Sequence, residues 1–193
     1  MKFDTICVQG AHKPAENRNT PPVPIYQTTA FSFDSVQYAA DLFDLKASGD
    51  IYTRLSNPTT NTLEERLAML EGGVGALAVS SGQSASLIAV LNIAKSGDEI
   101  VASTNMYGGT VNLMNVTLRK MGIETKFVSS DKAEDFEAQI TDKTRCIFVE
   151  MLNNPSLKIA DIENIAKVAH AHNIPLIVDN TITTPYLCRP IEF

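Results

Sequence analysis

Residue types that bind ligands follow apolar stretches at four places in the second part of the chain. The first is "SSGQ" at 80–83, where Gly82 and Gln83 begin an expected helix. Unpaired backbone N–H groups at a helix start bind phosphate, and glycine lets the backbone approach the anion. The same tetrapeptide is also typical of a serine cap followed by a turn glycine. Neither G-x-G-x-x-G nor G-x-x-x-x-G-K-[ST] is present, so a dinucleotide or Walker-type site is not supported.

The other three places offer an aromatic ring, an amide and a carboxylate. Tyr107 precedes two glycines and can stack on a planar ligand, although a lone tyrosine also suits a core or its edge. Asn154 lies in "EMLNNPS", beside Glu150 and Asn153, where turn formation is the alternative role. Asp179 directly follows the apolar "IPLIV". A carboxylate there needs a cationic or hydrogen-bonding partner, and an Asx-turn is the alternative.

Taken together, these four groups describe a pocket for a flat, phosphorylated, cationic ring. Pyridoxal 5′-phosphate (PLP) has this chemistry. No metal site is expected, because His170 and His172 are two residues apart and do not share a helix face, and His12 is distant in sequence.

From about residue 60 onward, apolar stretches alternate with amphipathic ones. The apolar stretches predict strands over 76–80, 99–102, 123–128, 145–149 and 174–178. Helices are predicted between them, one of them over 161–172 with Ile162, Ile165, Ala166 and Ala169 on one face. Such alternation favours an α/β fold with a mainly parallel sheet flanked by helices. In such sheets ligands bind beyond the carboxyl ends of the strands, where the four groups lie.

Local signals predict where two further helices begin. Asn61 with Glu64, and Asp131 with Glu134, have the spacing of a capping box. The first of these helices is expected to end at Gly72. Its predicted apolar face consists of Leu63, Leu67 and Leu70.

The first 60 residues differ from the rest of the chain in their proline content. Pro21, Pro22 and Pro24 oppose both helix and central strand, which predicts a surface arm over 1–60 and a layered domain over 61–193. The net charge is −6 and the basic residues are scattered, so nucleic acid is not an expected partner. No apolar run reaches the ~20 residues of a membrane helix, and a cytoplasmic protein with three reduced cysteines is expected.

Along essentially its whole length, the chain resembles the PLP-dependent enzymes of cysteine and methionine metabolism. The resemblance is carried by "PPVPIYQTTAFSF", "IYTRLSNPTTNTLEERLAMLEGG", "SSGQSA", "MYGGT", "NNPS" and "IPLIVDNTITTPYLCRPIEF". It implies the fold type I, aspartate-aminotransferase-like architecture. Within the family, "SSGQ" and "TPYLCRPIEF" favour the O-acetylhomoserine sulfhydrylases.

The resemblance also implies roles for individual residues. The amides of Gly82 and Gln83 would bind the cofactor phosphate, and Tyr107 would stack on the pyridine ring and assist proton transfer. Asn154 would reach the 3-oxygen of the ring, and Asp179 would pair with its nitrogen.

Two further residues are implied to act across a subunit boundary. Tyr52 and Arg54 would bind the phosphate of the neighbouring subunit, so that a homodimer or homotetramer shares its active sites.

The implied reaction is γ-replacement on O-acetyl-L-homoserine by sulfide or a thiol, giving homocysteine or methionine. Cystathionine γ-synthase or methionine γ-lyase chemistry is the alternative within the family. A third hypothesis is a non-catalytic fragment or cofactor-binding domain. In this family the lysine that holds PLP as a Schiff base follows the Asp-Asn-Thr turn after one more strand. The 193 residues are expected to end before that lysine and to be inactive alone.

Overall fold

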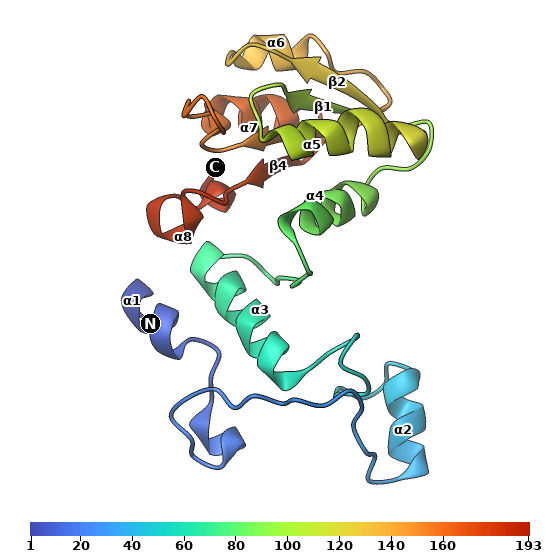
Figure 1. The fold of residues 1–193 in the computed structure, drawn as a ribbon, viewed down its shortest axis with the longest axis vertical. Coiled ribbons are helices and arrows are strands. Elements are labelled where there is room, and N and C mark those ends of the chain that lie inside the picture. Colours follow the sequence, from blue (N-terminus) through green and yellow to red (C-terminus); the bar gives the residue numbers. More distant parts are fainter. The chain divides into compact units, whose positions relative to one another are not determined.

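Four parallel strands form one sheet in the order β2-β1-β3-β4 (Figure 1). A computed structural model of the protein describes residues 1–193. The strands are β1 (Glu99–Ser103), β2 (Glu124–Val128), β3 (Thr144–Glu150) and β4 (Leu176–Asp179). The predicted strands over 99–102, 123–128, 145–149 and 174–178 are confirmed to within two residues at each end. Because all four run in parallel, their carboxyl ends meet at one edge of the sheet.

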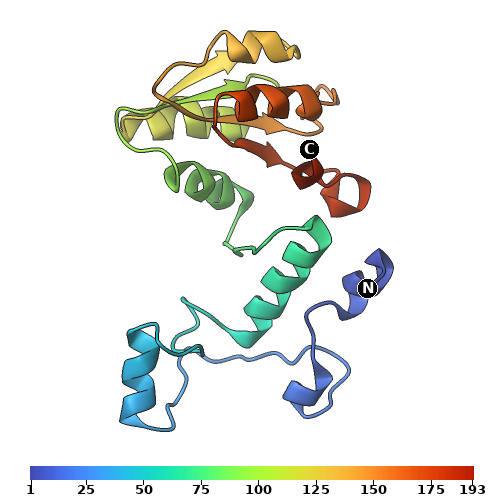
Figure 2. The same ribbon diagram turned by 180° about the vertical axis from the view of Figure 1, so that it is seen from behind.

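Helices cover both faces of this sheet. Figure 1 has α5 (Gly108–Asn112) in front of the strands, and Figure 2, from behind, has α7 (Ile162–Ala171) in front. α4 (Gly82–Leu91) and the π-helical η2 (Leu113–Leu118), which continues α5, share the first face, and α6 (Ala133–Glu137) shares the second. The predicted fold class, an α/β fold with a parallel sheet flanked by helices, is confirmed.

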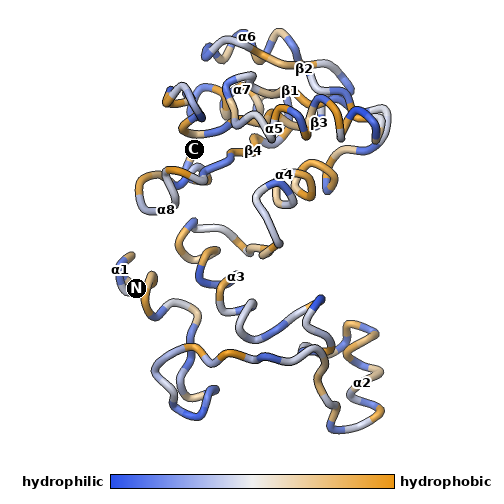
Figure 3. Tube along the Cα trace, viewed as in Figure 1, coloured by the Kyte–Doolittle hydropathy of each residue, from blue (hydrophilic) through white to orange (hydrophobic).

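Side chains alternate between the two faces, as the pleat requires. Cys146 and Phe148 point to the α4 face, and Ile147 and Val149 point to the α7 face. All four are almost completely buried. The tube in Figure 3 shows α4 largely in hydrophobic colours, which fits a helix that packs on the sheet.

α7 matches its prediction closely. Asp161 caps it by accepting from the N–H of Asn164, and the four predicted apolar residues are all buried. Asn173 follows it in the left-handed conformation, with φ of 56°, and so lets the chain turn into β4.

The predicted strand over 76–80 is wrong. These residues form no ladder, and Leu77 is 70% exposed. Instead, the N–H of Ala78 donates to Glu64 Oε1 at 2.7 Å. A strand is stable only beside a hydrogen-bonding neighbour, and no described strand pairs with this segment.

Both predicted capping boxes are also wrong. α3 (Pro58–Glu71) begins three residues before Asn61, because the side chain of Asn57 accepts from the N–H of Thr59 and Pro58 takes the first helical position. α6 begins after Lys132 with no side-chain cap. The end of α3 at Gly72, with φ of 77°, is confirmed.

The face predicted for α3 is only partly buried. Leu70 is buried, whereas Leu63 and Leu67 are 50% and 40% exposed. α3 belongs to a compact unit, Met1–Ala78, in which it packs against α1 (Phe3–Gln9), and few other elements cover it. The sheet belongs to a second unit, Val79–Phe193.

The remaining elements are short. The first unit also contains η1 (Pro14–Asn17) and α2 (Val36–Phe43), and the second ends in α8 (Thr184–Leu187) and η3 (Pro190–Glu192). Around the proline-rich segment several large apolar side chains are exposed, among them Ile25 at 82%. No helix of the chain has the length and apolar character to cross a membrane.

Candidate functional site

A cavity of about 250 Å³ lies between the start of α4 and the ends of β3 and β4. Small residues of α4, Gly82 and Ser86 among them, line one side. Phe148 and Ile177 line the opposite side, and the carboxylate-bearing residue Asp179 closes the polar end. The cavity thus has apolar residues on one wall, with a helix start and an acid beside it.

The start of α4 presents two free backbone donors. Ser81 caps the helix, because its hydroxyl accepts from the N–H of Ser84 at 3.1 Å and its carbonyl accepts from Ala85 at 3.0 Å. The N–H groups of Gly82 and Gln83 have no acceptor within the protein. A Cβ added at Gly82 would meet no atom within 4 Å, so no other group packs against this residue. The serine cap and the anion site are therefore compatible, and both fit this helix start.

Asp179 ends β4 and forms the predicted alternative, an Asx-turn. Its Oδ1 accepts from the N–H of Thr181 at 3.0 Å and from the hydroxyl of Thr181 at 2.5 Å. Oδ2 accepts no hydrogen bond from the protein. The turn therefore fixes the carboxylate and leaves one oxygen for a ligand.

Tyr107 precedes α5, and its ring lies over Gly109. A Cβ added at Gly109 would overlap the Tyr107 ring, whereas one added at Gly108 would meet nothing within 4 Å. Tyr107 is 52% exposed, so its ring is available to a ligand. The second glycine of "YGGT" is thus explained by the space that this ring needs.

Glu150, the last residue of β3, connects Tyr107 with Asn154. Its Oε2 accepts from the backbone N–H of Tyr107 at 2.7 Å, and the N–H of Asn154 also faces the carboxylate. Burial raises the pKa of Glu150, these two amides oppose the shift, and the charge of Asp179 adds to it. In the β3–β4 register Glu150 pairs with Asp179, so both side chains lie on the same face of the sheet.

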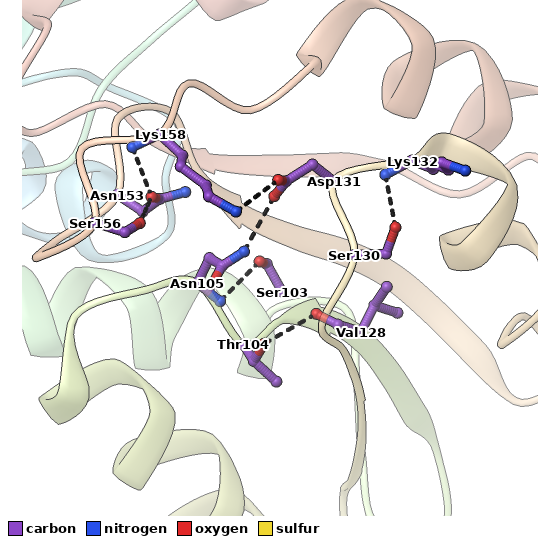
Figure 4. Close-up of polar contacts among 10 residues, drawn as sticks. All are labelled: Ser103, Thr104, Asn105, Val128, Ser130, Asp131, Lys132, Asn153, Ser156 and Lys158. Atoms are coloured by element: carbon purple, nitrogen blue, oxygen red, sulfur yellow. Dashed lines mark hydrogen bonds and ion pairs between the residues drawn. The ribbon is translucent and has the colours of Figure 1, made fainter.

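A polar network holds the loops that follow β1, β2 and β3 (Figure 4). Asp131 accepts from Asn105 Nδ2 at 3.0 Å and lies 3.3 Å from Lys158 Nζ. Asn153 is buried, and its side-chain oxygen accepts from the hydroxyl of Ser156 and from the N–H of Lys158. Asp131 thus joins three loops instead of capping α6, and Asn153 shapes the loop that carries the exposed Asn154.

Five of the seven predicted site residues come together at one end of the sheet. Gly82 and Asp179 line the same cavity. Gln83 Nε2 donates to the hydroxyl of Thr110, in α5, at 3.0 Å. The remaining two, Tyr107 and Asn154, both have their backbone N–H groups at Glu150. Glu150 was the residue that sequence reasoning passed over as a turn residue. Its available signal was a carboxylate directly after a buried strand, the same signal that singled out Asp179.

Tyr52 and Arg54 belong to the unit Met1–Ala78. Tyr52 forms an isolated antiparallel bridge with Ala30, and the guanidinium carbon of Arg54 lies 4.8 Å from the centre of the Tyr52 ring. Both side chains are exposed. This pairing orients the guanidinium without using its hydrogen-bond donors.

Comparison with known proteins decides the family. The model of the Cys/Met metabolism PLP-dependent enzyme family matches residues 4–193. The chain belongs to this family. The predicted family is thereby confirmed, and PLP is the cofactor on which enzymes of this family depend.

Relatives within the Cys/Met metabolism family carry sulfhydrylase names. The chain is 48% identical over 193 residues to sulfhydrylase FUB7 of Fusarium oxysporum, covering 100% of this chain and 45% of the relative. It is also 48% identical over 192 residues to O-acetyl-L-homoserine sulfhydrylase of Leptospira meyeri, of which it covers 43%. The chain therefore spans less than half the length of the curated relatives that it matches.

A solved structure gives the same result for the fold. A crystal structure named as an O-acetylhomoserine (thiol)-lyase of Campylobacter jejuni superposes with a TM-score of 0.95 at 41% identity. The match covers 100% of this chain and 47% of that one, which carries N′-pyridoxyl-lysine-5′-monophosphate at its position 205.

Proposed function

We propose that the whole protein is a PLP-dependent sulfhydrylase and that the cavity beside α4 holds the cofactor ring. The observation that carries this proposal is the pairing of two free amides, at Gly82 and Gln83, with the fixed carboxylate of Asp179 in one site. The two N–H donors suit a phosphate, and the carboxylate suits a protonated ring nitrogen. PLP carries both groups. The names of the relatives support the same activity.

Each residue contributes a separate physical effect. The Gly82 and Gln83 amides bind the phosphate, aided by the positive end of the α4 dipole. Tyr107 stacks on the ring and transfers protons nearby, and Asn154 donates to the ring's 3-oxygen. Asp179 accepts the N–H of the ring nitrogen. Two unit charges about 4 Å apart gain roughly 4 kcal/mol at an effective dielectric near 20, which favours the cationic ring by about three pK units.

When bound, PLP supplies an electron sink for the carbanion at the substrate α-carbon. The substrate class is an O-acylated homoserine, with O-acetyl-L-homoserine as the donor and sulfide or a thiol as the acceptor. Acetate leaves from the γ-carbon, and a carbon–sulfur bond forms there to give homocysteine or methionine. Asp179 favours this chemistry by keeping the ring nitrogen protonated.

The proposed assembly is a homodimer or homotetramer in which Tyr52 and Arg54 reach the phosphate of the neighbouring subunit. Two observations support it. Arg54 is exposed and its guanidinium donors are free for a phosphate, and large apolar residues of the proline-rich segment, such as Ile25, are exposed as at a protein–protein contact.

The test uses the complete protein, purified without cofactor and titrated with PLP. We expect a visible absorption band to appear and sulfide-dependent formation of homocysteine from O-acetyl-L-homoserine. Asp179→Asn should lower this rate on the order of 10² to 10³-fold, because it removes the charge that holds the ring proton. Asp135→Asn, on the exposed surface of α6, is the matched control. Cystathionine synthesis or methionine cleavage in place of sulfhydrylation would reject the substrate assignment.

A further inference from the structure

Glu150 is a buried carboxylate without a cationic partner. It is 6% exposed, and no lysine, arginine or histidine nitrogen lies within ion-pair distance. Burying an unpaired acid is costly, and the register places the acid of Asp179 beside it as well. Neither α4 nor α5, which cover this face, carries a charged residue, so Asp179 is the charged group that faces it. A position with this cost calls for a specific use of the acid.

The contacts of the Glu150 carboxylate with two backbone amides indicate its role. Tyr107 and Asn154 lie 47 residues apart, in the loops after β1 and β3. The backbone N–H of Tyr107 donates to Glu150 Oε2 at 2.7 Å, and the backbone N–H of Asn154 faces the same carboxylate. An ionised carboxylate has two acceptor oxygens and no donor. Glutamine has one acceptor oxygen, which can serve one of the two amides. Its NH₂ group is a donor and would face the other backbone N–H, which is also a donor. A carboxylate that accepts from the Tyr107 amide and still offers an acceptor to the Asn154 amide therefore explains glutamate at this position.

From this geometry we infer that Glu150 is a positioning residue for the cofactor, fixing the distance between the Tyr107 ring and the Asn154 amide and adding its negative charge beside Asp179. The inference rests on the proposed function, since Tyr107 and Asn154 matter here as contacts of PLP. It goes beyond the five predicted cofactor contacts, because Glu150 is not one of them and acts through the backbones of Tyr107 and Asn154. A cationic ring held at Asp179 also stabilises the ionised form of Glu150, so binding and positioning reinforce each other.

The experiment compares Glu150→Gln with wild type in the PLP-loaded, complete protein. The readouts are the dissociation constant of PLP, the circular dichroism of the visible cofactor band, the pH midpoint of that band, and kcat. Removing a negative charge near a cation moves the pH midpoint lower, by about one unit for a partly buried site. We expect this shift together with a weaker dichroic band, a kcat at least tenfold lower and a PLP affinity within about fivefold of wild type.

Two further variants separate positioning from folding. Glu124→Gln makes the same change at the exposed start of β2 and should match wild type in all four readouts. Glu150→Asp keeps the charge and both acceptor oxygens but shortens the side chain by one methylene, so it should restore most of the pH midpoint and only part of kcat. Urea unfolding of each variant checks that the fold is retained.

The outcomes distinguish this inference from the proposed function. If wild type forms no visible band with PLP, the proposed function fails. If wild type binds PLP but Glu150→Gln leaves both the pH midpoint and the dichroism unchanged, the positioning role of Glu150 is overturned and the proposed function stands. A loss of kcat with an equal loss of stability, and with unchanged spectra, would also overturn it.

Discussion

The side chain of Gln83 donates to the hydroxyl of Thr110 at 3.0 Å, and this bond joins the start of α4 to α5. Thr110 is 2% exposed, so the bond is shielded from water. The backbone of Gln83 faces the proposed phosphate, and α5 follows directly on Tyr107. One residue therefore connects the two ends of the proposed cofactor site.

Replacing Thr110 by valine tests this connection, since valine keeps the shape and removes the acceptor. A net loss of about 1 kcal/mol, typical of one hydrogen bond, corresponds to roughly fivefold weaker PLP binding. The measurement is a PLP titration of the cofactor-free protein. Thr125→Val is the control, because Thr125 bonds to the carbonyl of Met114 away from the cavity. Equal affinities of Thr110→Val and wild type would show that the bond does not support the site.

Gly109 and Gly108 form a matched pair for the Tyr107 ring. Alanine at 109 would overlap the ring and displace it, whereas alanine at 108 meets open space. We expect Gly109→Ala to lower kcat about tenfold and Gly108→Ala to stay within twofold of wild type. Alanine favours a helix by up to ~1 kcal/mol over glycine, so neither variant should lose stability. Similar kcat values for the two variants would contradict this explanation of the second glycine.

The amino end of β1 contains an ion pair that should control stability in acid. The buried Asp98 accepts from the N–H of Lys95 at 2.9 Å and from Arg145 at 2.9 Å. The Lys95 amide, and then Arg145, hold the pKa of Asp98 below its ordinary value. A lowered folded-state pKa means that this stabilisation is present above the unfolded-state pKa of about 3.9 and is lost as pH falls through the folded value.

Asp98→Asn should therefore be less stable than wild type near pH 7, and the difference should shrink as the pH falls below about 4. Urea unfolding at a series of pH values measures both curves. Asp135→Asn, at an exposed position of α6, serves as the control. A difference that stays constant down to pH 2.5 would rule out the carboxylate as its source.

Cys146 should be inert in the folded protein. Burial raises the pKa of its thiol to about 12, against an ordinary value near 8.5. At pH 8 the thiolate fraction falls by about 10³, so alkylation by iodoacetamide should slow at least that much. Mass spectrometry of native and urea-unfolded protein measures the rate at each cysteine. Modification of native Cys146 as fast as that of the exposed Cys7 would contradict the buried placement.

Local pattern was sufficient wherever an element's signal lies within its own residues. The extent and the buried face of α7 were predicted because the apolar residues recur at helical spacing within the segment itself. The start of α3 had a local signal too, since an asparagine before a proline is typical of a helix start, and Asn57-Pro58 provides it. The competing box at Asn61 and Glu64 obscured it.

The predictions that were wrong or missing concern features that depend on partners distant in sequence. Residues 76–80 are apolar enough for a strand, but strand formation requires a neighbour that no property of the segment supplies. Asp131 has the spacing of a cap and instead bonds to Asn105 and Lys158, both more than 25 residues away. The role of Glu150 likewise depends on an amide 43 residues earlier in the chain. The individual site residues were predictable by type, and the group that connects them was not.

The strand order β2-β1-β3-β4 also has a consequence for synthesis. β1 and β2 are made first and pair with each other, β3 then adds to the free side of β1, and β4 adds to β3. Each of β2, β3 and β4 thus finds its partner already made, and none of them has to be inserted between two strands that are already paired. β4 is the last of these four strands to be made, so Asp179 takes its place after the start of α4 has been made.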